Sequence, residues 1–123
     1  MALLADRTAV VTGGSSGIGR GIALEFARQG ADVVVADVRE DPKEGGDPTH
    51  EAIEAETDRS ATFVHCDVSS VSDLEAAVDA AEAFGGVDIM VNNAGIWRPE
   101  DFFEVTEADY QQLMDINMKG TYF

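Results

Sequence analysis

Short apolar runs alternate with segments of helical spacing along the chain. Four runs rich in valine and other apolar residues are too short for helices and predict buried strands of a parallel sheet. These runs are 8–12, 33–36, 61–66 and 87–91. Between them, apolar residues recur at helical spacing, and glycines follow two of these segments as stop signals. The predicted helices are 19–28, 49–57 and 72–84.

Strands and helices that alternate in this way form βαβ units with right-handed crossovers around a parallel sheet. We therefore predict an α/β fold: a partial Rossmann-type, doubly wound sheet of about four strands in the order 3-2-1-4, flanked by helices. Residues 39–48, with prolines, paired glycines and many charges, predict an exposed loop, and Thr49 is a candidate helix cap after it. Residues 106–109 resemble a capping box that opens a final helix. We expect residues 1–123 to form a single domain.

The strongest chemical signal is Thr12-Gly13-Gly14-Ser15-Ser16-Gly17-Ile18-Gly19, between the first predicted strand and helix. Backbone N–H groups at a helix N-terminus attract anions, and the strand–turn–helix context favours a dinucleotide pyrophosphate. We expect Gly13 to allow a tight turn, Gly17 to let the pyrophosphate approach, and Gly19 to let helix and strand pack closely. The spacing G-x-x-x-G-x-G departs from the generic G-x-G-x-x-G, and a flexible glycine turn is the alternative interpretation.

Asp37 ends the second predicted strand. An acidic residue about 20 positions beyond the glycines is placed to accept hydrogen bonds from the adenosine ribose hydroxyls. The same carboxylate repels a 2′-phosphate, which favours NAD over NADP, although the nearby Arg39 weakens that preference. A solvated loop aspartate is the alternative interpretation.

Polar turns also follow the third and fourth predicted strands. Asp67 either accepts a hydrogen bond from an adenine amino group or caps its own turn. Residues 92–95, Asn-Asn-Ala-Gly, lie at the edge where open α/β sheets bind ligands. Asparagine side chains there brace neighbouring backbone, and Gly95 leaves room for a ribose. Simple turn chemistry is the alternative for both segments.

Taken in order, these motifs resemble the short-chain dehydrogenase/reductase family over essentially the whole chain. The resemblance implies the NAD-binding portion of an oxidoreductase that moves a hydride between the cofactor and a small secondary alcohol or ketone. It also implies that Asn117 supports the catalytic proton relay, and that the complete parent is a homo-oligomer. The residues implied to contact the cofactor are Gly13, Ser15, Ser16, Gly17, Ile18, Gly19, Asp37, Asp67, Val68, Asn93, Ala94 and Gly95.

The chain departs from the family at the catalytic residues. The family uses a tyrosine four residues before a lysine, with a serine nearby, and no Tyr-x-x-x-Lys occurs here. Tyr110 is followed at that spacing by Met114, and Lys119 is preceded by Asp115. We therefore expect a truncated portion of a longer enzyme that is inactive alone. The alternatives are a non-catalytic NAD-binding module, an inert truncated gene product, or an enzyme completed by a separately encoded segment.

Charge and composition limit the classes of partner that this protein is expected to bind. Twenty-four acidic against eight basic residues give a net charge of −16, which argues against nucleic-acid binding and against an anionic membrane. No apolar run is long enough for a membrane span, and the N-terminus lacks a signal-peptide pattern. The single cysteine excludes an internal disulfide, and we expect a cytoplasmic protein. The acidity is typical of a solvated surface, with adaptation to molar salt as a sharper alternative.

The histidines and the cysteine predict no metal site. His65 and Cys66 are adjacent on a predicted strand and therefore point to opposite faces of the sheet. His50 lies in a polar segment, with no third ligand at suitable spacing. Cys66 is predicted to be a small buried hydrophobic residue.

Overall fold

The computed structural model describes residues 3–94 of the chain. Its elements are β1 (Thr8–Thr12), α1 (Gly17–Arg28), β2 (Asp32–Asp37), α2 (Thr49–Glu56), β3 (Ala61–His65), α3 (Val71–Ala80), a 3-10 helix η1 (Ala81–Phe84) and β4 (Ile89–Val91). The strands form a parallel sheet in the order β3-β2-β1-β4, which confirms the predicted order. The capping box and final helix predicted from 106 onward lie outside the described residues. Over residues 3–94, no helix has the length and apolar character needed to cross a membrane.

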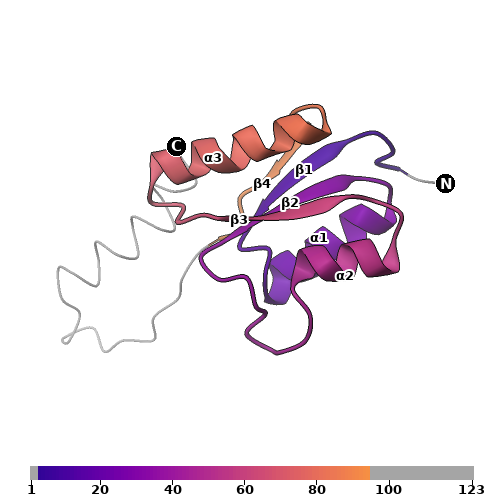
Figure 1. Cartoon of the computed structure of the whole chain (residues 1–123), viewed down its shortest axis with the longest axis horizontal. Helices are drawn as coiled ribbons and strands as arrows, with labels where there is room; N and C mark the ends of the chain where they lie inside the picture. Colours follow the sequence, from indigo (N-terminus) through magenta and orange to yellow (C-terminus); the bar gives the residue numbers. More distant parts are fainter. Residues whose placement is uncertain (1–2, 95–123) are drawn as a thin grey trace.

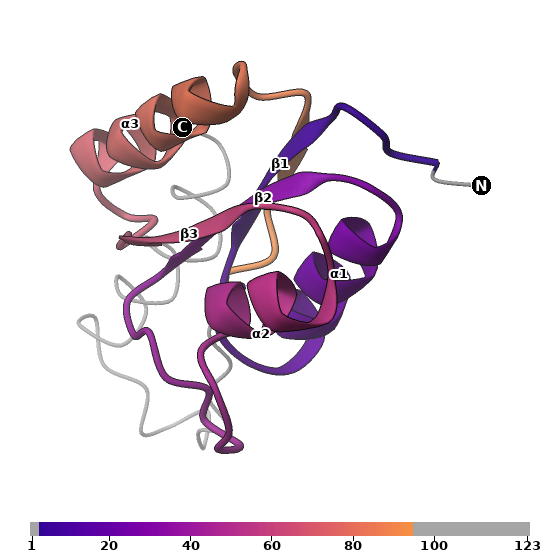
Figure 2. The same ribbon diagram turned by 45° about the vertical axis from the view of Figure 1, so that its right-hand side comes forward.

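The sheet lies between two helical layers, with α1 and α2 on one face and α3 on the other (Figure 1, Figure 2). Alternate strand residues point to opposite faces. Val10 and Val34 pack in the cluster under α3, whereas Val11 and Val35 pack in the cluster with α1 and α2. All four are fully buried. Because helices cover both faces, the strands read as continuous valine-rich runs rather than alternating ones.

The start of α1 differs from the prediction. The helix begins at Gly17 rather than Gly19. The Arg20 N–H already donates to the Ser16 carbonyl at 3.2 Å, which closes a helical turn around Gly17. The glycine turn is therefore shorter than expected, and the N-terminus of α1 lies closer to β1.

The prediction that Thr49 caps α2 is wrong. Pro48 occupies the N-cap position, and the backbone of Thr49 is already helical. The buried Thr49 hydroxyl instead donates to the Gly14 carbonyl at 2.9 Å and accepts from the Arg20 guanidinium at 3.0 Å. These contacts tie the start of α2 to the glycine turn.

The fourth strand is shorter than the predicted 87–91 and spans Ile89–Val91. Asp88, just before β4, pairs with Thr8 at the start of β1 through both its side chain and its backbone N–H. The Thr8 N–H donates to the Asp88 carboxylate, and the Asp88 N–H donates to the Thr8 carbonyl, both at 2.9 Å. The Thr8 N–H therefore donates to a side chain, whereas a continuing strand ladder would need it to donate to a backbone carbonyl.

Candidate functional site

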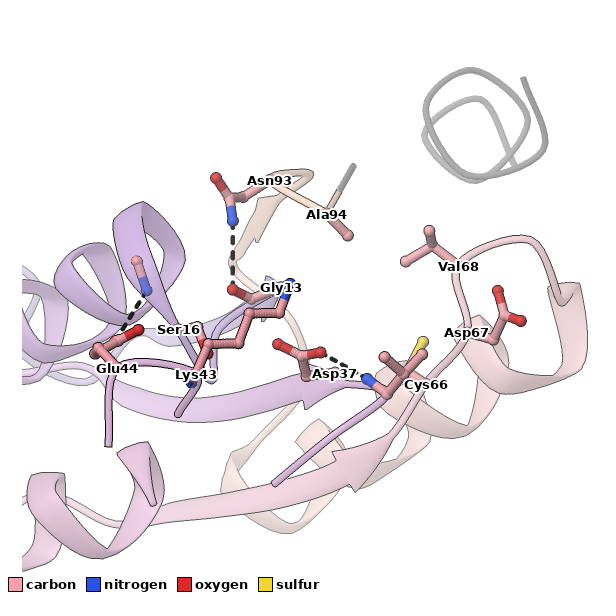
Figure 3. A pocket seen from close by; sticks show the side chains of 12 residues that line it. Gly13, Ser16, Asp37, Lys43, Glu44, Cys66, Asp67, Val68, Asn93 and Ala94 are labelled. Carbon is pink, nitrogen blue, oxygen red and sulfur yellow. Dashed lines mark hydrogen bonds between the residues drawn. The ribbon is translucent and has the colours of Figure 1, made fainter. Parts of the chain in front are cut away.

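A cavity of about 370 Å³ opens at the carboxyl edge of the sheet (Figure 3). Known small-molecule sites commonly enclose about 300–1,000 Å³. The cavity lies beside the point where the strand order reverses, at which open α/β sheets bind ligands. Its lining comes from the segments that follow the strands: Gly13, Ser16, Gly17, Asp37, Val38, Lys43, Glu44, Cys66, Asp67, Val68, Asn93 and Ala94.

The glycine turn between β1 and α1 forms one wall of this pocket. Gly13 and Gly17 have φ values of +66° and +55°, a region that side-chain-bearing residues rarely adopt. A Cβ on Gly17 would meet nothing within 4 Å, so its positive φ, and not crowding, is what favours glycine at this position. A Cβ on Gly19 would overlap the Gly13 carbonyl oxygen and lie 2.5 Å from the Asn93 amide nitrogen. The positive φ of Gly13 agrees with a tight turn, and Gly19 packs closely against the turn after β1 and the Asn93 side chain rather than against a strand.

The Thr12 hydroxyl joins the ends of β1 and β4. It donates to the Val91 carbonyl at 3.2 Å and accepts from the backbone N–H groups of Asn93 and Ala94, each at 3.0 Å. The Asn93 side-chain amide donates to the Gly13 carbonyl at 3.4 Å. Asn93 thus braces neighbouring backbone, one of its expected roles. Sequence reasoning missed the role of Thr12, because a threonine that ends a strand carries no signal of its partners.

Asp37, at the end of β2, lies on the pocket wall beside the glycine turn (Figure 3). Its carboxylate accepts from the Ser15 N–H at 3.1 Å and from the Val38 N–H at 2.7 Å. The Arg39 guanidinium donates to the Asp41 carbonyl at 2.7 Å, and Arg39 does not line the pocket. Asp37 therefore places a carboxylate on this wall, and the Arg39 guanidinium suspected of weakening its effect is bonded to the Asp41 carbonyl instead.

Asp67 and Val68 form the opposite wall, after β3 (Figure 3). One Asp67 carboxylate oxygen accepts from the Ser69 hydroxyl at 2.6 Å and from the Ser69 N–H at 2.9 Å. The hydroxyl, and then the N–H, hold the pKa of Asp67 below its usual value. This contact therefore stabilises the fold above the ordinary pKa of an aspartate and is lost as the pH falls through the lowered value. Asp67 caps its own turn, one of the two predicted alternatives, and still faces the cavity.

Lys43 and Glu44 belong to the pocket, although their segment was predicted only as an exposed loop. The Glu44 carboxylate accepts from the Gly17 N–H at 3.1 Å, and the Lys43 N–H donates to the Ser16 hydroxyl at 2.7 Å. The Gly17 N–H is the main cause that lowers the pKa of Glu44 from its usual value. In so acidic a sequence, nothing distinguishes Glu44 from its neighbours before the chain is folded.

The other predicted contact residues lie in different places. Ser15 is fully buried beneath the turn, Gly19 is buried behind it, and the Ile18 side chain is exposed outside the cavity lining. Gly95 and Asn117 lie outside the described residues. Within residues 3–94, no three acidic, histidine or cysteine side chains gather in an arrangement suited to a metal ion.

Cys66 is buried at the back of the pocket, as predicted, with 2% of its surface exposed. Burial, and then the carboxylates of Asp73, Asp67 and Asp37, raise the pKa of the Cys66 thiol to about 11. At pH 8, the fraction of Cys66 present as thiolate is about a hundredfold lower than that of an ordinary cysteine. A thiolate with a higher pKa is also the stronger nucleophile, and this difference offsets about tenfold of the loss in reaction rate.

We therefore expect iodoacetamide to alkylate the native chain at least about tenfold more slowly than the chain unfolded in guanidinium chloride. Mass spectrometry measures both rates at this single cysteine. Equal rates would show that Cys66 is accessible and its pKa ordinary.

A parallel α/β sheet with a glycine turn opening its first helix and an aspartate ending its second strand defines a dinucleotide-binding class of protein. The family model for short chain dehydrogenases matches residues 7–123, and the chain belongs to this family. Its members bind a nicotinamide dinucleotide cofactor.

Relatives extend well beyond the matched region. The chain is 42% identical to L-2,3-butanediol dehydrogenase of Corynebacterium glutamicum, with 96% of this chain and 45% of that protein covered. It is 40% identical to (+)-borneol dehydrogenase 2 of Salvia officinalis, with 97% and 41% covered. A solved structure from Sinorhizobium meliloti, described as a short-chain alcohol dehydrogenase, superposes with a TM-score of 0.86 at 39% identity, with 97% and 46% covered. The chain thus spans less than half the length of these proteins.

Proposed function

We propose that this chain supplies the NAD-binding portion of a short-chain oxidoreductase that acts on a small secondary alcohol or ketone. The observation that carries the proposal is the position of Asp37. Its carboxylate is held by the Ser15 N–H at the wall of the pocket that the glycine turn opens. A carboxylate there suits the two ribose hydroxyls of NAD and repels the 2′-phosphate of NADP.

The residues around the cavity fit the parts of a dinucleotide. The N-terminus of α1 at Gly17 would hold the pyrophosphate, because its N–H groups and helix dipole favour negative charge. Asp67 and Val68 would flank the adenine, and Asn93 and Ala94 the central part of the cofactor. When bound, the cofactor supplies the hydride chemistry, while this chain binds and orients it.

The substrate class of the whole protein is supported by its relatives. Two of them are named for alcohols, butanediol and borneol. By the family resemblance, Gly95 would adjoin the cofactor, and Asn117 would support the proton relay. No Tyr-x-x-x-Lys occurs in the sequence. We propose that this chain alone binds NAD without dehydrogenase activity.

Calorimetric titration of the chain with NAD and with NADP tests this proposal. We expect saturable binding of NAD, about a hundredfold tighter than that of NADP, because the hydrogen bonds from the ribose hydroxyls to the Asp37 carboxylate and its repulsion of the 2′-phosphate together separate the two ligands by about 3 kcal/mol. With 2,3-butanediol and NAD present, we expect no absorbance from reduced nicotinamide. A chain that is folded by circular dichroism but takes up no NAD would refute nucleotide binding. Tighter binding of NADP would refute the cofactor preference, and formation of NADH would refute the lack of activity.

A further inference from the structure

The N-terminus of α1 is already in contact with a carboxylate from a distant loop. The first turn of this helix contains no acidic residue of its own. Instead, Glu44, 27 residues away along the chain, accepts from the Gly17 N–H at 3.1 Å (Figure 3). A helix N-terminus favours negative charge, and this side chain supplies it.

Two further contacts hold the loop 39–48 against the same region. The Lys43 N–H donates to the Ser16 hydroxyl at 2.7 Å, and the Arg20 guanidinium donates to the Asp47 carbonyl at 2.8 Å. Together with the Glu44 contact, these bonds attach three loop residues, Lys43, Glu44 and Asp47, to the glycine turn and the first turn of α1. The contact made by Glu44 is therefore part of a docked arrangement rather than one isolated surface contact.

The ligand proposed for this pocket needs the same position. A pyrophosphate that approaches the N-terminus of α1 would meet the Glu44 carboxylate at the Gly17 N–H, and two anions on one donor repel each other. Glu44 is exposed, so its carboxylate can move into water when the ligand arrives. While the Glu44 carboxylate stays bonded to the Gly17 N–H, the molecule cannot bind the phosphates at this position. Apparent affinity falls in proportion to the fraction of open molecules.

We propose that Glu44 is an internal competitor for the cofactor's pyrophosphate, which occupies the N-terminus of α1 in the free protein and thereby lowers affinity for NAD. This inference rests on the proposed function. It makes Glu44, which lies outside the glycine turn, a residue that sets cofactor affinity.

Calorimetric titration with NAD at physiological ionic strength tests the inference on the chain and its Glu44→Ala, Glu44→Gln and Glu40→Ala variants. Glu44→Ala removes the competing oxygen atoms, and we expect NAD to bind about fivefold more tightly. Glu44→Gln keeps an oxygen acceptor but loses its charge, so we expect a smaller gain. Glu40→Ala removes the same charge from the same loop, away from the cavity lining, and we expect unchanged affinity.

A second measurement needs no ligand. Hydrogen exchange at the Gly17 amide, followed by NMR, should be faster in Glu44→Ala than in the parent chain, because its acceptor is gone. If the parent binds NAD and Glu44→Ala binds equally or more weakly, the inference is wrong while the proposed function stands. An equal gain in Glu40→Ala would assign the effect to net charge and would also overturn it. If none of the folded proteins binds NAD, the proposed function itself fails, and the inference fails with it.

Discussion

Gly19→Ala is expected to lower the free energy of unfolding by about 3 kcal/mol, near the upper end of typical costs for overpacking. The added methyl group would overlap the Gly13 carbonyl oxygen and lie 2.5 Å from the Asn93 amide nitrogen. The Gly13 carbonyl belongs to the backbone of the glycine turn, which the Gly13 N–H ties to the Ala36 carbonyl, so it cannot move aside without disturbing that turn, whereas the Asn93 amide ends a side chain that can rotate away. Denaturation with urea, followed by circular dichroism, measures the change.

Gly21→Ala is the matched control in the same helix. A Cβ on Gly21 would meet nothing within 4 Å, and its position in the helix is exposed. Alanine has the higher helix propensity, so we expect stabilisation by about 0.5–1 kcal/mol. If both substitutions changed stability equally, close packing at Gly19 would not be the reason for glycine there.

Asp37→Asn is expected to shift the ratio of NAD to NADP affinity by about a hundredfold in favour of NADP. Hydrogen bonds to a charged acceptor contribute about 1.5–3 kcal/mol, and the lost repulsion of a phosphate adds about 1 kcal/mol. A total of about 3 kcal/mol corresponds to roughly that ratio. Asparagine retains an oxygen that can accept from the Ser15 N–H, so the turn should keep its shape. Titration of each variant with both dinucleotides measures the ratio.

Asp41→Asn serves as the control for net charge. Asp41 is exposed in the following loop, outside the cavity lining, so its removal should leave the ratio unchanged. A melting temperature for each variant separates loss of binding from loss of folding. If the ratio moved equally in both variants, or in neither, Asp37 would not select the cofactor.

The hydrophobic pattern was sufficient to predict the sheet. Val33, Val34 and Val35 form an uninterrupted apolar run, and such a run is stable as a strand only when both of its faces are covered. The observed core agrees, since these residues divide between clusters on opposite faces of the sheet. Element ends were less predictable because local bonds, such as Asp88 to the Thr8 N–H, decide where a ladder stops.

The pocket was predictable in part for the same reason. Parallel strands end at one edge, so the residues that follow each strand must meet there. Asp37, Asp67 and Asn93 were found by this argument, and all three line the cavity. Ser15 and Ile18 were not distinguished from their neighbours in the turn, because the direction of each side chain depends on backbone angles that the motif does not specify.

The sequence by itself determined the order of strands and helices, the glycines at the first turn and the acidic residue that ends β2, because these depend on local periodicity and backbone sterics. Tertiary structure alone decided which distant groups meet: the Thr12 hydroxyl with the end of β4, the Thr49 hydroxyl with Gly14, and Glu44 with Gly17. Such contacts join residues separated by 27 to 81 positions. Their partners are selected by the path of the folded chain, which local preferences do not contain.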